Sequence, residues 1–233
     1  MAGRRMSGLV AAVALAAALP AAASAQGVLT LSGGYFAVRG EDGRPEDDVL
    51  RRNLDFLAFD LDDFGGFTIN GEYHFPLGDY LEVGGGVGYY QNSVPSVYRD
   101  VIDSDGSEIF QELKLRVVPF TATARFYPFT RQAPVQPYIG AGLGVFWWRY
   151  AETGEFVDFA DDTIFRNSYV DEGAEFGPVI LAGVRFPVGD MFAAGGEFRY
   201  QDAKPDLDPD QGFAGDRIDL GGYTWLATFQ WRF

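Results

Sequence analysis

His74 is the only histidine among the 233 residues, so any catalytic chemistry based on imidazole has to use it. A histidine activates a serine nucleophile when a carboxylate orients it and all three groups lie within hydrogen-bond reach. Ser32 and Glu82 are the candidates that the strand pattern described below brings towards His74. Because these side chains would point into a narrow interior without access to lipid, we expect an internal hydrogen-bond cluster there and no enzyme. The chain has no cysteine, which excludes thiolate ligands and a cysteine nucleophile.

Carboxylates gather in two short segments with the chemistry to bind a divalent cation. Asp206, Asp208 and Asp210 have the spacing that begins a calcium-binding loop. However, Gly212 comes one place late, and Arg217 stands where such a loop needs a bidentate glutamate. The second, irregular group consists of Asp60, Asp62 and Asp63. We therefore predict no cofactor and no regular metal centre, and the two aspartate groups remain candidates for irregular calcium binding.

The overall charge excludes one class of partner. The chain carries 33 acidic and 18 basic residues, a net charge of −15, whereas a protein that binds nucleic acid needs a basic surface. Beyond the N-terminus, no run approaches the roughly 20 apolar residues that a membrane-spanning helix needs. The composition is nevertheless rich in aromatic residues, at 16%, and contains 30 glycines, which is unusual for a packed soluble core.

The first 25 residues have the pattern of an export signal. Arg4 and Arg5 form a positive start, residues 9–19 are apolar, and Ala23-Ser24-Ala25 is a small-residue cleavage site. We predict a signal peptide over 1–25, cleaved after Ala25, and a mature domain over 26–233. Loss of the two arginines changes the net charge from −15 to −17.

Most of the mature chain alternates between apolar and polar residues with period two, as β-strands do. In the last segment, Tyr223, Trp225 and Phe229 alternate with polar neighbours, and Leu226 is the one exception. Similar alternation, weaker in the first case, covers 29–37, 67–75, 81–90, 120–127, 176–186, 192–200 and 220–233. In 138–150 both faces are apolar or glycine, so its phase stays open. Eight strands of about 9–13 residues result, which is the length of a tilted strand that crosses a bilayer.

The lengths of the connections predict an up-and-down barrel. Short turns at 76–79, 130–135 and 187–190 alternate with long loops at 39–66, 92–111, 151–174 and 202–217. The turn Phe75-Pro76-Leu77-Gly78-Asp79 returns as Phe186-Pro187-Val188-Gly189-Asp190. A soluble barrel is the alternative, but so many apolar side chains would overfill an eight-stranded interior. Apolar runs at 54–61 and 156–165 leave strand extensions, or ten strands, as a minor alternative.

These features together resemble the family of small eight-stranded outer-membrane β-barrels related to OmpA, OmpX and OmpW. The resemblance covers the mature chain and depends on the signal peptide, on 137–144 as a mid-barrel strand, and on the terminal strand. It implies an all-β, eight-stranded antiparallel transmembrane barrel in the outer membrane of a Gram-negative bacterium. It also implies that the aromatic end of the chain is the signal for the barrel-assembly machinery, namely Phe229, Trp231 and Phe233. The lipid A deacylase barrels have a His-x-Ser pattern that this chain lacks at His74.

If the apolar faces point to lipid, seven charged side chains point into the barrel. They are Glu72, Glu82, Arg125, Arg185, Glu197, Arg199 and Arg232. Opposite charges in a low-dielectric interior pair with one another, because an unpaired buried charge is costly. We therefore predict a salt-bridged plug, and an ion-lined conduit is the alternative. Inward-facing Gly84, Gly86 and Gly88 would leave local space or allow tight curvature.

The four long loops hold 25 of the 33 acidic residues and 8 basic ones, so the whole excess charge faces the cell exterior. We interpret the protein as a monomeric barrel with a structural or surface-interaction role, which contacts outer-membrane lipid and lipopolysaccharide. Lys114 and Arg116 are placed to meet lipopolysaccharide phosphates. Divalent cations at the acidic loops are further expected partners. The alternative function is a narrow porin-like channel for small or hydrophobic solutes.

Overall fold

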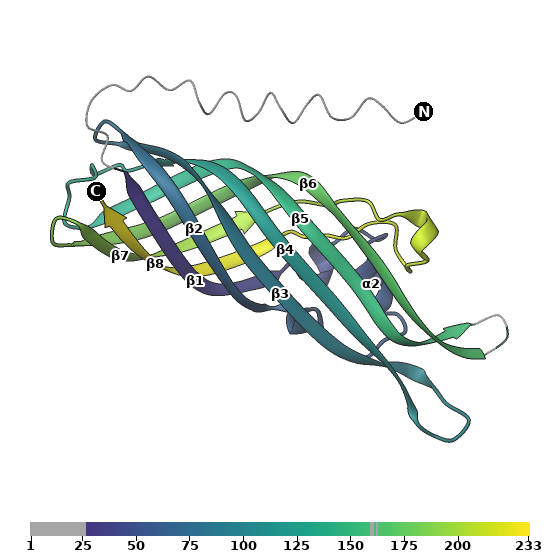
Figure 1. Ribbon diagram of the computed structural model, residues 1–233. Coiled ribbons are helices and arrows are strands. Elements are labelled where there is room, and N and C mark those ends of the chain that lie inside the picture. The colour runs from purple at the N-terminus through teal and green to yellow at the C-terminus, as the bar shows by residue number, and fades with distance from the viewer. Residues whose placement is uncertain (1–26, 159–160, 162) are drawn as a thin grey trace, which may run out of the picture.

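Eight antiparallel strands form a closed barrel in the computed structural model, which describes residues 27–158, 161 and 163–233. The strands pair in chain order, and β1 closes the barrel against β8 (Figure 1). They are β1 (Val28–Val38), β2 (Gly66–Leu77), β3 (Leu81–Ile102), β4 (Glu108–Phe126), β5 (Gln136–Asp158), β6 (Thr163–Val188), β7 (Phe192–Gln201) and β8 (Gly222–Arg232). The predicted signal peptide, 1–25, lies outside the described residues. The fold class predicted from the alternation is confirmed, with eight strands rather than ten.

The alternation of the sequence sorts side chains between the interior and the outer surface. On β8, Trp225 and Phe229 are exposed, whereas Thr224, Thr228 and Leu226 are buried inside, so the exception in the pattern is an inward residue. The segment without a clear phase, 138–150, contains both an inward and an outward set of aromatic and apolar residues. Its outward members are Ile139, Leu143 and Trp147, and its inward members are Tyr138, Phe146, Trp148 and Tyr150.

Two of the four predicted loops are in fact strands. β3 and β4 continue through most of 92–111, and β5 and β6 continue through most of 151–174. The reason is a reversal of the pattern: beyond about Trp147, most of the buried side chains are apolar and most of the exposed ones are polar. The alternation therefore persists, but charged residues on its exposed side resemble loop composition. The apolar run at 156–165 does extend strands, whereas 54–61 does not form one.

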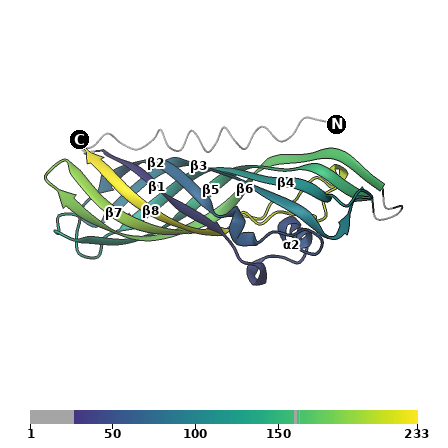
Figure 2. The same cartoon turned by 90° about the horizontal axis from the view of Figure 1, so that it is seen from below.

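The extended parts of β3–β6, together with the connections 39–65 and 202–221, form what we call the outer half. Figures 1 and 2 place α2 (Val49–Asn53) there, beyond the ends of the shorter strands. Leu50 of α2 and Ile218 of the last connection pack with Leu113 and Leu115 of β4 in one apolar core. The two connections also pair with each other, since Val49 N donates to Arg217 O at 2.9 Å. The outer half thus has a core like that of a soluble protein.

The short turns, the start of β1 and the end of β8 lie at the opposite end of the barrel, which we call the inner end. Phe233 N donates to Gly27 O there, at 3.1 Å. The repeated turn design uses Gly78 and Gly189 at φ of 70° and 71°, a left-handed conformation that glycine adopts without steric cost. Neither glycine has an atom within 4 Å of an added Cβ, so backbone conformation alone explains their presence.

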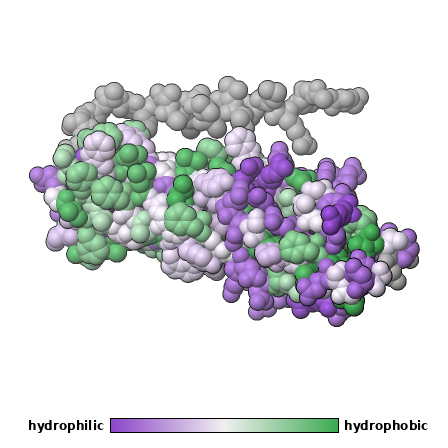
Figure 3. Space-filling model, turned by 60° about the horizontal axis from the view of Figure 1, so that its bottom comes forward, coloured by the Kyte–Doolittle hydropathy of each residue, from purple (hydrophilic) through white to green (hydrophobic). Residues whose placement is uncertain are grey.

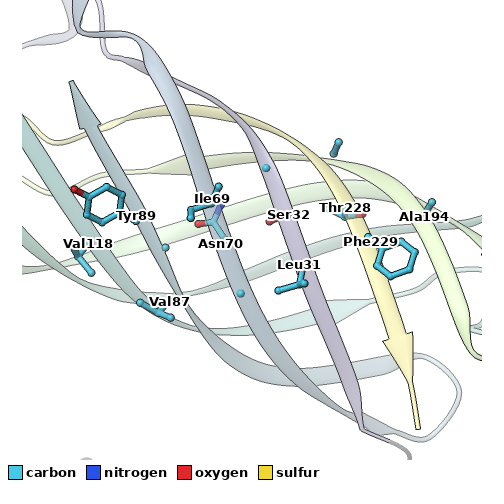
Figure 4. Close-up of a pocket in the computed structure, with 14 residues that line it drawn as sticks. Leu31, Ser32, Ile69, Asn70, Val87, Tyr89, Val118, Ala194, Thr228 and Phe229 are labelled. Carbon is cyan, nitrogen blue, oxygen red and sulfur yellow. The ribbon is translucent and has the colours of Figure 1, made fainter. Parts of the chain in front are cut away.

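Between the inner end and the outer half, exposed apolar side chains encircle the barrel in what we call the apolar band. Figure 3 shows this part as largely hydrophobic and the outer half as largely hydrophilic. A hollow of about 890 Å³ lies on the band, with Leu31, Ile69 and Phe229 among its rim residues and Gly33 and Ala227 among its small ones (Figure 4). The hollow belongs to the surface that the sequence assigns to lipid. Among the described residues, none of the helices has the length and apolar character needed to cross a membrane.

Candidate functional site

Four charged side chains inside the apolar band form a closed circuit, which we call the charged ring. Arg125 Nη2 donates to Glu72 Oε2 at 2.6 Å and to Glu197 Oε2 at 2.7 Å. Arg199 Nη2 completes the circuit, with Glu72 Oε1 at 2.7 Å and Glu197 Oε1 at 2.6 Å. Because β2, β4 and β7 supply these residues, the ring joins different sides of the barrel. Two acids and two arginines balance in charge, which is the condition for burying them.

A second layer of ion pairs lies nearer the inner end. Glu82 of β3 pairs with Arg185 of β6 at 3.0 Å and accepts a hydrogen bond from Tyr127 Oη at 2.7 Å. Arg185 also donates to Gln230 and lies over the ring of Tyr127, 4.6 Å from its centroid. In the charged ring, the guanidinium of Arg125 lies over the ring of Tyr138 in the same way, 5.3 Å from its centroid. Arg125 and Arg185 thus each combine ion pairing with a cation–π contact.

Six of the seven predicted lumen charges are brought together in these two layers, and Arg232 is not. Its guanidinium donates to Gln136 Oε1 at 3.2 Å, near the end of β8 where the barrel meets solvent. Arg131, from a short turn, takes the place near Glu82 instead, with Nη1 at 3.3 Å from Glu82 Oε1. The prediction for Arg232 came from the phase of β8, which indicates direction but not how far along the barrel axis a partner lies.

His74 and Ser32 do not form a catalytic pair. The register places His74 opposite Val28, so Ser32 is four residues further along β1, a separation of about 13 Å at 3.3 Å per residue. The imidazole Nδ1 lies 3.4 Å from Arg125 Nη1, and Nε2 lies 3.5 Å from Thr123 Oγ1. Since a guanidinium can only donate, Nδ1 accepts and Nε2–H faces the threonine hydroxyl. The imidazole therefore belongs to the lumen network.

Little free space remains in the lumen above the charged ring. A cavity of about 20 Å³, enough for one water molecule, is lined by Arg199, Asn70 and Tyr90 among others. The inward glycines of β3 do not open a passage, because side chains of β2 lie over them. A Cβ on Gly86 would lie 2.5 Å from Glu72 Cγ, and one on Gly88 would lie 2.3 Å from Asn70 Oδ1.

The outer half contains a second buried polar cluster, which sequence reasoning missed. Asn53 Nδ2 of α2 donates to Glu152 Oε1 of β5 at 2.6 Å, and Tyr150 Oη donates to the same oxygen at 2.8 Å. Burial raises the pKa of the Glu152 carboxyl above its ordinary value of 4.5, although both hydrogen bonds act in the opposite direction. Burial also raises the pKa of Asp48, against the lowering effect of Arg44.

The predicted calcium ligands are occupied with other contacts. Asp206 Oδ1 lies 3.5 Å from Arg217 Nη2, and Asp208 Oδ1 accepts a hydrogen bond from Asp210 N at 3.0 Å. In the other group, Asp63 Oδ2 accepts from Asp60 N at 2.9 Å. Throughout the described ranges, no group of three or more histidine, aspartate or glutamate side chains is arranged to hold a metal ion.

The aromatic residues at the end of the chain and the basic residues of β4 lie on the outer surface. Phe229, Trp231 and Phe233 are all exposed, and the rings of the last two are 5.3 Å apart. Lys114 and Arg116 lie on the outward face of β4, just beyond the apolar band. These positions agree with contacts to the membrane and its surface, and the recognition roles remain predictions.

Only some of the site residues that were not predicted have a signal in the sequence. Tyr127 continues the inward set of 120–127 and could have been included in the lumen cluster. Tyr138 lies in the segment whose phase stayed open, and Asn53 lies in an outer connection without strand alternation. The contact between Asn53 and Glu152 joins residues 99 positions apart. No local pattern indicates such a pair.

Comparisons with known proteins agree with this architecture. The model of the family described as outer membrane protein beta-barrel domain matches residues 8–233. The crystal structure of Neisserial surface protein A, at 16% identity and a TM-score of 0.50, covers 90% of this chain and 98% of its own. Outer membrane protein W of E. coli, at 15% identity and a TM-score of 0.46, covers 90% and 99%. The first likeness shows the fold alone. A search of the curated proteins found no match.

Proposed function

We propose, from the premise that this chain belongs to the outer membrane protein β-barrel domain family, that it has a structural or surface-interaction role with a closed lumen. Family membership places the protein in the outer membrane of a Gram-negative bacterium. The proposal adds that the interior is a plug and that the outer half is the part available to partners. Export by a cleavable signal peptide over 1–25 is part of the same proposal.

The charged ring is the observation that carries the proposal. Arg125 is 1% exposed and contacts two carboxylates, each of which also contacts Arg199. An ion entering this circuit would have to separate pairs at 2.6–2.7 Å in a medium where charges are poorly solvated. An eight-stranded barrel has little room besides its own side chains, so the pairs also fill the cross-section.

The apolar core of the outer half supports the same conclusion independently. Val117, Phe146 and Trp148 are buried inside the extended strands, directly beyond the small cavity above the ring. Hydrated ions do not enter an apolar core, because the loss of water is not compensated there. Two obstructions of different chemistry therefore lie in series along the barrel.

Single-channel recording in a planar bilayer tests the closed lumen. We expect no conductance steps from the refolded wild type. Arg125→Ala is the test variant, and Arg149→Ala is the matched control, because Arg149 is an exposed outer-surface arginine paired with Glu172 at 2.7 Å. Reproducible wild-type steps that change with Arg125→Ala and not with Arg149→Ala would refute the plug and establish the narrow channel.

A non-enzymatic role is also part of the proposal. His74 contacts Arg125 and Thr123, and Ser32 lies too far along β1 to reach it. Expression in a host lacking the protein should therefore leave the mass of lipid A unchanged. A mass change that His74→Ala abolishes would establish a lipid-modifying activity.

A further inference from the structure

Asn53 of α2 ties the helix to β5 of the outer half through hydrogen bonds to Glu152 and Tyr150. Asn53 is completely buried, and its Nδ2 lies 2.6 Å from Glu152 Oε1. Glu152 is 5% exposed, yet among the described residues no basic side chain forms an ion pair with it. Its hydrogen-bond donors are two neutral groups, the Asn53 amide and the Tyr150 hydroxyl. A carboxylate in this position would be a buried charge without a counter-charge, which is costly.

The oxygen atom of the same Asn53 amide indicates how this cost is avoided. Asn53 Oδ1 is a buried acceptor with no hydrogen-bond donor. A buried acceptor of this kind is destabilising unless a donor is supplied, because it has lost its hydrogen bonds to water. A protonated carboxyl group has one acceptor oxygen and one O–H donor, which matches the one donor and one acceptor of an amide. A proton on Glu152 would therefore remove both defects at once.

We propose that Glu152 is protonated when the outer half is closed, that its O–H serves Asn53 Oδ1, and that the pair is a pH-sensitive latch for α2. The latch holds the first outer connection over the apolar core. Deprotonation leaves a charge against the amide carbonyl oxygen and favours release of α2. The latch involves the outer half only, so a test of the latch is independent of whether the lumen conducts ions.

The groups that surround Glu152 do not supply a competing charge. Tyr98 of β3 and Tyr150 of β5 are its titratable neighbours on the strands, and burial is the main reason that the pKa of each tyrosine is raised, with the nearby Glu152 carboxyl acting in the same direction. The strand register places Leu113 of β4 and Tyr169 of β6 opposite Glu152. Two charged groups of the connection that carries α2 lie beyond, Asp48 and Arg44, and they pair with each other at 3.4 Å. This pair of opposite charges adds no net charge to the cluster.

The sign of the pH dependence follows from the raised pKa of Glu152. The free carboxyl in the open state titrates near its ordinary value of 4.5, and the closed state holds the proton to higher pH. The stabilisation of the closed state is therefore complete below about pH 4.5 and is lost as the pH rises through the raised pKa. Since one proton is involved, the opening equilibrium increases by at most about tenfold per pH unit in this window.

Infrared spectroscopy reads the protonation state directly. We expect one carboxylic acid C=O band that persists above the pH at which exposed carboxyl groups have ionised. It should be missing in Glu152→Gln and retained in Glu155→Gln, a control on the same strand whose carboxylate pairs with Arg166 at 2.9 Å. A spectrum without such a band in the wild type would overturn the proposal.

Thiol labelling reads the opening of α2. The chain has no cysteine, so Val49→Cys places a single probe at a fully buried position of the helix. A dipyridyl disulfide reacts with thiols at acidic and neutral pH, and the rate is measured in Glu152 and Glu152→Gln backgrounds. The ratio of the two rates cancels the ionisation of the thiol itself.

We expect this ratio to be constant below about pH 4.5 and to rise above it, by at most about tenfold per pH unit. A ratio that stays constant across the whole range would refute the latch. Absence of labelling at every pH would also refute it, because α2 would then not open. Urea unfolding of the labelled variants confirms that the barrel itself is folded in each case.

Discussion

Replacement of Arg125 by methionine is the sharpest test of the charged ring. The guanidinium donates to Glu72 and Glu197 at 2.6 and 2.7 Å, and methionine keeps the apolar stem of the side chain without its charged end. The two carboxylates then share Arg199 alone, which leaves one uncompensated negative charge in the barrel. Removing one partner of a buried ion pair typically costs about 3–5 kcal/mol. We expect Arg125→Met to lower the free energy of unfolding by this amount.

The double variant Arg125→Met/Glu197→Gln separates charge balance from lost contacts. It removes one base and one acid, so that the pair between Glu72 and Arg199 remains neutral, at 2.7 Å. The double variant should therefore lose less stability than the sum of the two single variants, with a coupling energy of about 1–3 kcal/mol. Equilibrium unfolding in urea, in phospholipid vesicles and followed by tryptophan fluorescence, gives all four free energies. Strict additivity, or a single variant within about 0.5 kcal/mol of the wild type, would refute the reasoning.

Three further predictions concern other parts of the chain. Gly78→Ala and Gly189→Ala should each lower the free energy of unfolding by about 1–2 kcal/mol, because both positions have a left-handed φ, and Gly78→Asn should cost less. Unequal effects in the same urea assay would contradict the common turn design. Leu50→Ala, in the outer core, should lower local stability by about 2–5 kcal/mol and increase hydrogen exchange of the outer half only. Faster exchange at the inner end of β1, around Leu29, as well would disprove separate halves, because Phe36 and Val38 at its outer end share the core with Leu50. Chelation of divalent cations should leave the thermal unfolding midpoint unchanged, and a fall that Asp206→Ala abolishes would establish a metal site.

The strands within the apolar band were predictable from the sequence because their two environments, lipid and lumen, alternate residue by residue. Phe120 and Phe126 face outward and Arg125 faces inward, as the period-two pattern requires. Six of the seven predicted lumen charges have ion-pair partners on other strands, since few acids and bases share a narrow space. The partner of Arg232 was not predictable, because the pattern fixes the face of a strand and not the reach of a side chain along the barrel.

The strands of the outer half were not predicted from the sequence. These strands alternate as regularly as the others, but Leu113 and Leu115 point inward while Lys114 points out, which is the reverse of the membrane arrangement. Charge counting therefore assigned the neighbouring segments 92–111 and 151–174 to loops. The contact of Asn53 with Glu152 is a different case, because it depends on how a connection of the chain folds back over the strands. Only the tertiary structure brings these two positions together.

The reversal of polarity along β4 and β5 divides one barrel into two bodies with opposite solvent requirements. In the apolar band, charges such as Arg125 are stable only because the interior excludes lipid and pairs them. In the outer half, Leu50 and Leu113 are stable only because water surrounds the outside. The cores meet at the small cavity near Asn70, where a few polar side chains separate them. Substitutions in the outer core should consequently leave the charged ring intact, since sites without shared partners contribute additively. The outer half is then free to vary its surface chemistry without a change in the membrane part, which is the arrangement that a surface-interaction protein requires.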